Sequence, residues 1–302
     1  MKLSATIKLA LDALLRNRAR SLLTMLGVII GVGAVIVTVA IGAGARISVQ
    51  NQINSLGSNM IVVLPGSTTQ YGARSGLGGA STLTPDDGMA IAKLPGVAAV
   101  SPAVTVRTQA VSGSNNWQTT VTGVAPTYTF IRSWPMDSGA FFTQNDALSA
   151  AKVAVLGQTV VDNLFPDGSS PLGRTVLLKG VPFTIVGTLK ALGQSGIGQD
   201  QDDTILIPYT SAMERLTAQT TVGTLTISAT DSQNVQNVQN EVTALLEQRH
   251  RIVPPQQDDF QVRNLQDIAA AASSTGAVME FLLAGVAAVS LIVGGIGIMN
   301  IM

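Results

Sequence analysis

Two long apolar runs without a single charge lie near the ends of this 302-residue chain, at residues 22–41 and 281–302. An α-helix of about 20 residues crosses a hydrocarbon core roughly 30 Å thick. Either run could instead be a buried core helix, but two charge-free runs of this length favour two membrane spans. We place these spans at residues 21–42 and 281–302 and expect both to contact the lipid bilayer.

The charges next to the runs predict which side of the membrane each region faces. Residues 1–20 hold five Lys or Arg and one acid, Asp12. A basic lead before an apolar run is also typical of a signal peptide, but the apolar part of such a peptide is only about 7–15 residues. By the positive-inside rule, the N-terminus is cytoplasmic and residues 43–280 are extracytoplasmic.

Three further helical segments are expected beside the spans. Residues 1–20 place polar side chains at four-residue intervals opposite an apolar face, which predicts an amphipathic helix in the membrane interface. The alternative is that they are only the polar lead of the first span. Residues 43–56 and 264–280, the latter with Asn264 as a candidate cap, are expected as stalk helices.

Glycines mark where the spans would pack against other helices. Gly27 and Gly31 have GxxxG spacing, and Gly294, Gly295 and Gly297 give the second span a small-residue surface. These five are the helix-packing candidates, although glycine is common in membrane helices and the spacing is a weak signal. Because two spans make a poor bundle, we expect partner helices.

The region between the runs is predicted to be a mixed α/β domain, because short apolar strands alternate with helices. Expected strands lie at 60–64, 97–124 (two or three, with a turn at 112–116), 152–156, 175–189 (a hairpin turning at Gly180), 204–208, 224–229 and 260–262. Expected helices lie at 84–94, 159–165 and 235–250. The predicted fold class is therefore an α+β membrane protein with two transmembrane helices bracketing this domain.

Residues that could carry chemistry are few. The chain has no cysteine and one histidine, His250, which argues against thiol catalysis and against zinc. His250 could belong to a catalytic triad, but the end of a polar helix favours a solvated cation there. Asp200, Asp202 and Asp203 could bind calcium, but their spacing differs from an EF-hand loop and favours a solvated loop.

Nucleotide and nucleic-acid binding are also disfavoured. No lysine follows a glycine, so the Walker A phosphate loop is missing and ATP would have to be hydrolysed by another chain. Removing Asp12 and the five leading bases from the totals of 18 acids and 18 bases leaves 17 acids and 13 bases outside the membrane. A net negative domain predicts no nucleic-acid partner. No cofactor, metal site or catalytic residue is expected.

Short motifs follow one another in a fixed order along nearly the whole chain. They are LLRNRARSLLTMLGVIIG at 14–31, VTGV at 121–124, SGAFF at 138–142, VAVLG at 153–157, LF at 164–165, PLG at 171–173, FTIVG at 183–187, IPY at 207–209 and GGIGIMNIM at 294–302. With these motifs the sequence resembles the MacB/FtsX-like ABC-transporter permeases of the bacterial inner membrane.

The resemblance implies four spans with a periplasmic core domain between the first two, so this chain would be truncated after the second span. It also implies a two-lobed domain on helical stalks. We place a porter-like lobe at 57–126 and 213–263, and a smaller inserted lobe at 127–212.

The resemblance further implies partners and a mechanism. The expected partners are a second copy in a homodimer, a separate ABC ATPase subunit, a periplasmic adaptor (membrane fusion) protein and an outer-membrane channel. The expected role is export or mechanotransmission, in which ATP hydrolysis moves the periplasmic domain. The alternative is a two-span membrane sensor with a periplasmic ligand-binding domain; a membrane-anchored hydrolase would need a catalytic set that the sequence does not offer.

Overall fold

The computed structural model describes most of the region between the two apolar runs and scattered positions within them. The described residues are 25–26, 29–30, 32–33, 36–44, 59–66, 69–70, 73–74, 82–194, 199–253, 256–264, 278, 281–282, 285, 288–289 and 292. The chain divides into two compact units, residues 1–50 with 269–302, and residues 51–268.

The terminal unit is described only in part. Every described residue within 25–44 and 278–292 is helical, and large apolar side chains there are exposed, from 42% for Val32 to 81% for Phe281. Within the described residues, no helix is both long enough and apolar enough to cross a bilayer. The expected interfacial helix 1–20 lies outside the described residues, and the expected spans at 21–42 and 281–302 and stalks at 43–56 and 264–280 are described only in part.

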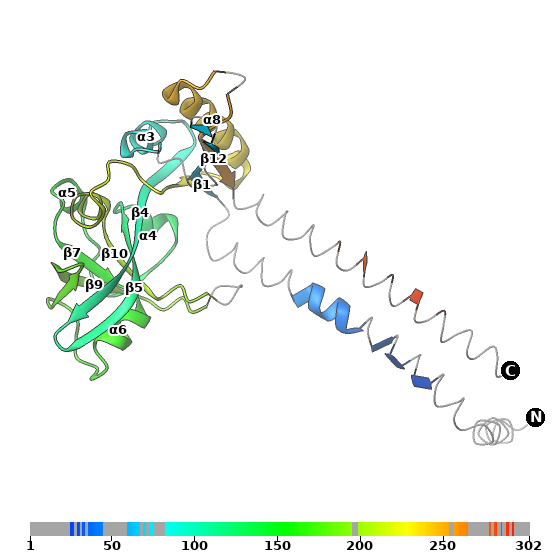
Figure 1. The fold of residues 1–302 in the computed structure, drawn as a ribbon, viewed down its shortest axis with the longest axis horizontal. Coiled ribbons are helices and arrows are strands. Elements are labelled where there is room, and N and C mark those ends of the chain that lie inside the picture. The colour runs from blue at the N-terminus through cyan, green and yellow to red at the C-terminus, as the bar shows by residue number, and fades with distance from the viewer. Residues whose placement is uncertain are drawn as a thin grey trace, which may run out of the picture. The chain divides into compact units, whose positions relative to one another are not determined.

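The unit formed by residues 51–268 begins and ends in one antiparallel sheet with strand order β12-β1-β11-β4. Its elements are β1 (Met60–Pro65), α3 (Pro85–Ile91), β4 (Val97–Ser112), β11 (Thr224–Ala229), α8 (Val235–His250) and β12 (Phe260–Asn264). Helix α3 connects β1 to β4, and α8 connects β11 to β12. This is the βαββαβ arrangement of ferredoxin-like domains, with an insertion between β4 and β11 (Figure 1).

Strand β4 is 16 residues long, and its second half belongs to another set of strands. The pairings close a ring, β4-β5-β10-β7-β9-β8 and back to β4, and β6 extends the ring beside β9. These strands are β5 (Asn115–Val124), β6 (Met136–Gly139), β7 (Val153–Leu156), β8 (Thr175–Leu178), β9 (Val181–Leu189) and β10 (Thr204–Pro208).

Short elements complete the unit. They are the two-stranded β2 (Thr69–Gln70) and β3 (Ala73–Arg74), the helices α4 (Tyr128–Ile131), α5 (Gln144–Leu148), α6 (Gln158–Leu164) and α7 (Tyr209–Ser211), the π-helix η1 (Ala212–Thr217) and the 3-10 helix η2 (Ser232–Asn234).

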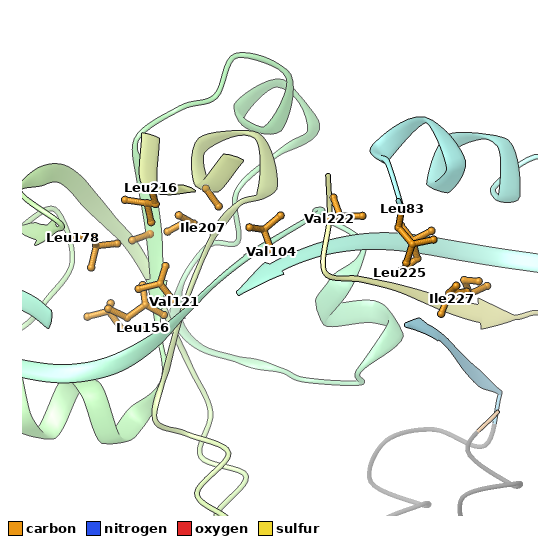
Figure 2. Packing of buried hydrophobic residues seen from close by; sticks show 14 of the residues in the cluster. Leu83, Val104, Val121, Leu156, Leu178, Ile207, Leu216, Val222, Leu225 and Ile227 are labelled. Carbon is orange, nitrogen blue, oxygen red and sulfur yellow. The ribbon is translucent and has the colours of Figure 1, made fainter. Parts of the chain in front are cut away.

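One apolar core runs through both sets of strands. In Figure 2 it passes from Ile227, Leu225 and Leu83 to Val222 and Val104, and on to Ile207, Val121, Leu156, Leu178 and Leu216. Because the core is continuous along β4, the sheet and the ring share buried apolar surface and stabilise each other.

The strands and helices expected in this region are confirmed within a few residues at their ends. The 97–124 stretch forms two long strands that turn at Gly113 and Ser114, and α3 begins with Thr84 as N-cap and Pro85 in its first turn. Strand β12 continues two residues beyond its expected end and includes Asn264. The helix that Asn264 was expected to cap lies outside the described residues.

The pairing of β5 bears on where the lobes divide. Residues 115–124 were expected in the porter-like lobe, but β5 pairs only with β10 and with the second half of β4, inside the ring. The boundary between the two sets of strands therefore falls within β4, near Val104.

Gly157 provides a test of how tightly the ring is packed. A Cβ at this position would collide with the Asp202 carbonyl oxygen and would lie 3.1 Å from that of Thr204. We predict that Gly157→Ala lowers the free energy of unfolding by about 1–3 kcal/mol, since overpacking forces the backbone to move. Denaturant unfolding followed by tryptophan fluorescence measures this change.

The matched control is Gly223→Ala, because the nearest atom to a Cβ there, the Ala103 carbonyl oxygen, is 3.6 Å away. Equal stability of the two variants would contradict the packing described for Gly157.

Candidate functional site: the strand pair joined to both terminal segments

Both connections between this unit and the terminal segments leave from neighbouring strand ends. Strands β1 and β12 are antiparallel, with register from Ile61↔Asn264 to Pro65↔Phe260. Neighbouring strands lie about 4.8 Å apart. The chain therefore enters β1 and leaves β12 side by side at the same end of the pair, and β1 also pairs with β11 on its other edge.

Amide side chains form hydrogen bonds at both of these ends. Asn59, just before β1, donates from its side-chain Nδ2 to the Ala229 carbonyl oxygen at 3.3 Å, and its main-chain carbonyl oxygen accepts from the Ala229 N–H at 2.9 Å. Asn264, which is 3% exposed, donates to Oε1 of Gln239 on α8 at 2.8 Å. Gln239 in turn donates to the Val262 carbonyl oxygen at 3.3 Å. Each connection is thus held against the sheet or α8 where it meets the domain.

The opposite end of the strand pair is held by a charged cluster of four side chains, Asp87, Arg249, His250 and Asp259. Arg249 Nε donates to Asp87 Oδ1 at 2.6 Å. His250 lies 2.8 Å from Asp259 Oδ1 through Nδ1 and 3.4 Å from Asp87 Oδ2 through Nε2. The cluster joins the last turn of α8 to the first turn of α3, where acids and bases complement the two helix dipoles.

Asp87 is the centre of this cluster. It is 3% exposed and forms a capping box with Thr84, whose N–H and Oγ1 donate to Oδ2 at 2.9 and 2.7 Å. Burial by itself raises the pKa of the Asp87 carboxyl, but the hydrogen bonds from Arg249 and Thr84, together with nearby His250, hold that pKa below its usual 3.8.

Two expectations about charged residues are wrong. His250 was expected to be solvated, but its side chain is only 10% exposed and its ring packs edge-on against Phe260. The sequence offered a signal, because basic residues at the end of one helix suit acidic residues at the start of another. The spatial pairing of α3 with α8 was not visible in the sequence.

The acidic loop at 200–203 is also not simply solvated. Asp202 is 4% exposed and accepts from the Leu192 and Gly193 N–H groups at 2.8 and 2.7 Å, so it fastens a turn. Asp203 accepts from Trp117 Nε1 at 2.8 Å. In the described part of the chain, no group of three or more His, Cys, Asp or Glu side chains could hold a metal ion.

The predicted helix-packing residues, Gly27, Gly31, Gly294, Gly295 and Gly297, all lie outside the described residues. The strand pair was not predicted as a site, because the sequence indicates strands at 60–64 and 260–262 without showing that they are partners.

The fold and the strand pair define a class: an α+β core domain between two terminal segments whose described residues are helical, with its first and last strands paired with each other. The family described as the MacB-like periplasmic core domain matches residues 21–245. The chain belongs to this family, as a MacB-like periplasmic domain of ABC-transporter permeases.

Curated relatives named macrolide export ATP-binding/permease protein MacB are similar to this chain over nearly its whole length. The relative from Rhodospirillum rubrum is 41% identical over 301 residues, covering 98% of this chain and 44% of the relative. The relative from Azoarcus sp. is 40% identical over 293 residues, covering 97% of this chain and 43% of the relative. The chain therefore spans less than half the length of these two relatives.

Solved structures share the fold. The periplasmic region of MacB from Actinobacillus actinomycetemcomitans aligns with a TM-score of 0.61 at 21% identity, over 72% of this chain and 94% of that one. The extracellular domain of the noncanonic ABC-type transporter YknZ from Gram-positive bacteria aligns with a TM-score of 0.56 at 18% identity. The alignment covers 68% of this chain and 100% of that one.

The Asp87 cluster predicts a dependence of stability on pH. Since the pKa of Asp87 is lower in the folded protein than its usual 3.8, the cluster stabilises the fold above about pH 4. This contribution is lost as pH falls through the lowered pKa. We predict that Asp87→Asn lowers the free energy of unfolding at pH 7 by about 1–3 kcal/mol, and that the difference shrinks below pH 4.

Denaturant unfolding at pH 7, 4 and 3 measures this dependence. Asp167→Asn is the control, because Ser169 also lowers the pKa of Asp167 but that carboxyl is fully exposed. If the free energies of unfolding of the wild type and of Asp87→Asn differed by the same amount at pH 7, 4 and 3, the role given to the Asp87 carboxylate would be contradicted.

Proposed function

We propose that this chain is part of the permease subunit of an ABC-type exporter or mechanotransmission complex. A separate ATPase subunit hydrolyses ATP, and the permease converts this into movement of its periplasmic domain. The observation that carries the proposal is the β1–β12 pair, which attaches both terminal segments to adjacent strands of one sheet.

The geometry of this pair suits transmission of movement. When both connections move together, the load passes along the β1–β11 ladder, where the hydrogen bonds of four register pairs share it. When the connections separate, the β1–β12 bonds are loaded one at a time from the Asn264 end. The side-chain hydrogen bonds of Asn59 and Asn264 lie at this end, where the strands would begin to separate.

The load then has a path through the rest of the domain. Strand β11 pairs with the first half of β4, and the second half of β4 belongs to the ring. Because one apolar core fills both, we propose that the domain of one chain moves as a single body. The porter-like lobe is then the βαββαβ part and the smaller inserted lobe is the ring.

The membrane arrangement is part of the proposal. Residues 21–42 and 281–302 span the bacterial inner membrane, the N-terminus is cytoplasmic, and residues 43–280 are periplasmic. Exposed apolar side chains at the described helical positions, such as Ile29, Ile36 and Phe281, support burial in lipid or against other helices. Gly27, Gly31, Gly294, Gly295 and Gly297 are the proposed contact points between spans.

The proposed partners are an ABC ATPase, a second copy of the permease, a periplasmic adaptor protein and an outer-membrane channel. The names of the relatives specify macrolide export. Macrolides are therefore the first substrates to test with this protein.

Assembly with an ATPase tests the proposal. We predict that the protein, purified from cells that express it at its native locus and reconstituted in nanodiscs, retains an ABC ATPase. Its ATP hydrolysis should exceed that of the ATPase alone. This hydrolysis should stop when the Walker A lysine of the ATPase is replaced.

Recovery of the protein without any ATPase, and instead with a cytoplasmic signalling protein, would contradict the permease proposal and favour the two-span sensor.

A further inference from the structure

The imidazole of His250, at the end of α8, lies between two carboxylates that belong to different elements. Its Nδ1 is 2.8 Å from Oδ1 of Asp259, the residue just before β12, and its Nε2 is 3.4 Å from Asp87 Oδ2 on α3. The side chain is only 10% exposed, and the Phe260 ring packs edge-on against it with 5.7 Å between the ring centroids. The imidazole therefore has one apolar neighbour and two acidic ones.

The two contacts together determine how many protons the imidazole carries. A carboxylate oxygen only accepts hydrogen bonds, and a neutral imidazole has a single N–H donor. Although burial raises the pKa of the Asp87 carboxyl, hydrogen bonds from Arg249 and Thr84 hold that pKa below its usual 3.8, so Asp87 has no proton to donate near neutral pH. Both nitrogens of His250 can therefore donate only when the side chain is an imidazolium.

The charges of the cluster support the same conclusion. Asp87 and Asp259 contribute two negative charges, and Arg249, which pairs with Asp87, contributes one positive charge. An imidazolium at His250 brings the sum to zero, whereas a neutral imidazole leaves one carboxylate without a counter-charge, which is costly away from water. That carboxylate is Asp259, because no Lys or Arg pairs with it in the part of the chain that the structure describes.

Other charged residues near the cluster do not replace these partners. Those nearest in sequence lie on α3, at the end of α8 and before β12, and none forms an ion pair with His250 within the described ranges: Asp86, Glu247, Arg251 and Asp258. All of them except Glu247 are exposed. The imidazole therefore faces two carboxylates, with the Arg249 guanidinium on the far side of Asp87.

Asp259 connects the imidazole to the strand pair. Its main-chain carbonyl oxygen accepts from the Gly66 N–H at 2.7 Å and from Thr82 Oγ1 at 3.3 Å. Gly66 directly follows β1, and a Cβ there would lie only 2.7 Å from the Asp259 carbonyl carbon. Asp259 thus holds the end of β1 through its main chain and the end of α8 through its side chain.

We propose that His250 is a proton-operated latch on the β1–β12 pair. As an imidazolium it bridges Asp87 and Asp259, and it ties α3 and α8 to the start of β12. When it loses one proton and keeps the other on Nδ1, whose contact is the shorter one, the Asp87 contact is lost and the Asp259 contact becomes a weaker hydrogen bond from a neutral donor. The latch is therefore closed at mildly acidic pH and loosens as pH rises.

The latch itself does not depend on what the protein transports. It lies at the end of the pair opposite the two connections to the terminal segments. A closed latch therefore keeps β1 and β12 together at the end that would separate last under load. Only this use of the latch in transmitting movement rests on the proposed function.

The chain has one histidine, so its protonation can be followed without overlap from other residues. The full chain is purified through a histidine-free tag into nanodiscs, with the imidazole nitrogens isotopically labelled, and is titrated by nitrogen NMR between about pH 5 and pH 9. We expect Asp87→Asn and Asp259→Asn to release the proton at a pH about one unit or more below that of the wild type, because each loses a carboxylate partner. An imidazole that never changes its protonation state, or variants that match the wild type, would overturn the latch.

Amide hydrogen exchange in the same nanodiscs measures whether the imidazole controls the strand pair. We expect the protection factor of the Gly66 amide to fall by about fivefold or more as His250 loses its proton, because local opening no longer has to break the charged contacts. The Gly157 amide, which donates to the Thr204 carbonyl oxygen at 2.9 Å within the ring of strands, is the matched control and should keep its protection.

Two substitutions distinguish charge from shape. His250→Lys keeps a positive charge and should hold the Gly66 amide protected over the whole pH range, whereas His250→Gln is neutral and should leave it at the level of the wild type at high pH. Protection of Gly157 shows that each variant is folded. Constant Gly66 protection in the wild type while the imidazole titrates would overturn the latch, as would an unchanged pH dependence in His250→Gln. No ATPase is present in these measurements, so a failed latch leaves the proposed function to be decided by ATPase assembly.

Discussion

The hydrogen-bonded pairing of β1 with β12 is the constraint on which the rest of this structure depends. It brings residues that are about 200 positions apart in the chain, Ile61 and Asn264, into direct register. The pairing completes the βαββαβ sheet and leaves both connections at one end of it. The charged cluster around Asp87 holds the other end. Because β4 continues from this sheet into the ring, we propose that displacement of the β1–β12 pair acts on the whole unit.

Much of the secondary structure could be predicted from the sequence, because local chemistry determines it. Apolar runs bounded by turn residues located β10 and β11, and the Thr-Pro sequence at 84–85 marked the start of α3. The family motifs were also visible, and Gly157 shows why one of them ends in glycine: the neighbouring backbone leaves no room for a side chain.

The candidate site could not be predicted, because it depends on contacts between distant segments. The surroundings of His250 come from α3 and from the residue before β12, so its position at a helix end suggested solvent where the structure has two carboxylates. The change of partners within β4 could not be predicted for a related reason. A 16-residue strand can change partners midway, and strand periodicity alone does not reveal those partners.

A reversible disulfide across β1–β12 tests the central claim most directly. Val62 and Arg263 are register partners, and the chain has no other cysteine, so a Val62→Cys, Arg263→Cys variant forms one defined cross-link. The matched control is a Gln109→Cys, Gln118→Cys variant, which places the same cross-link between register partners of β4 and β5 in the ring. If the pair moves as a unit, export by the oxidised β1–β12 variant should equal export after reduction, as for the matched control. Loss of export on oxidation that reduction restores, in the β1–β12 variant alone, would show that the strands must separate and would contradict the account.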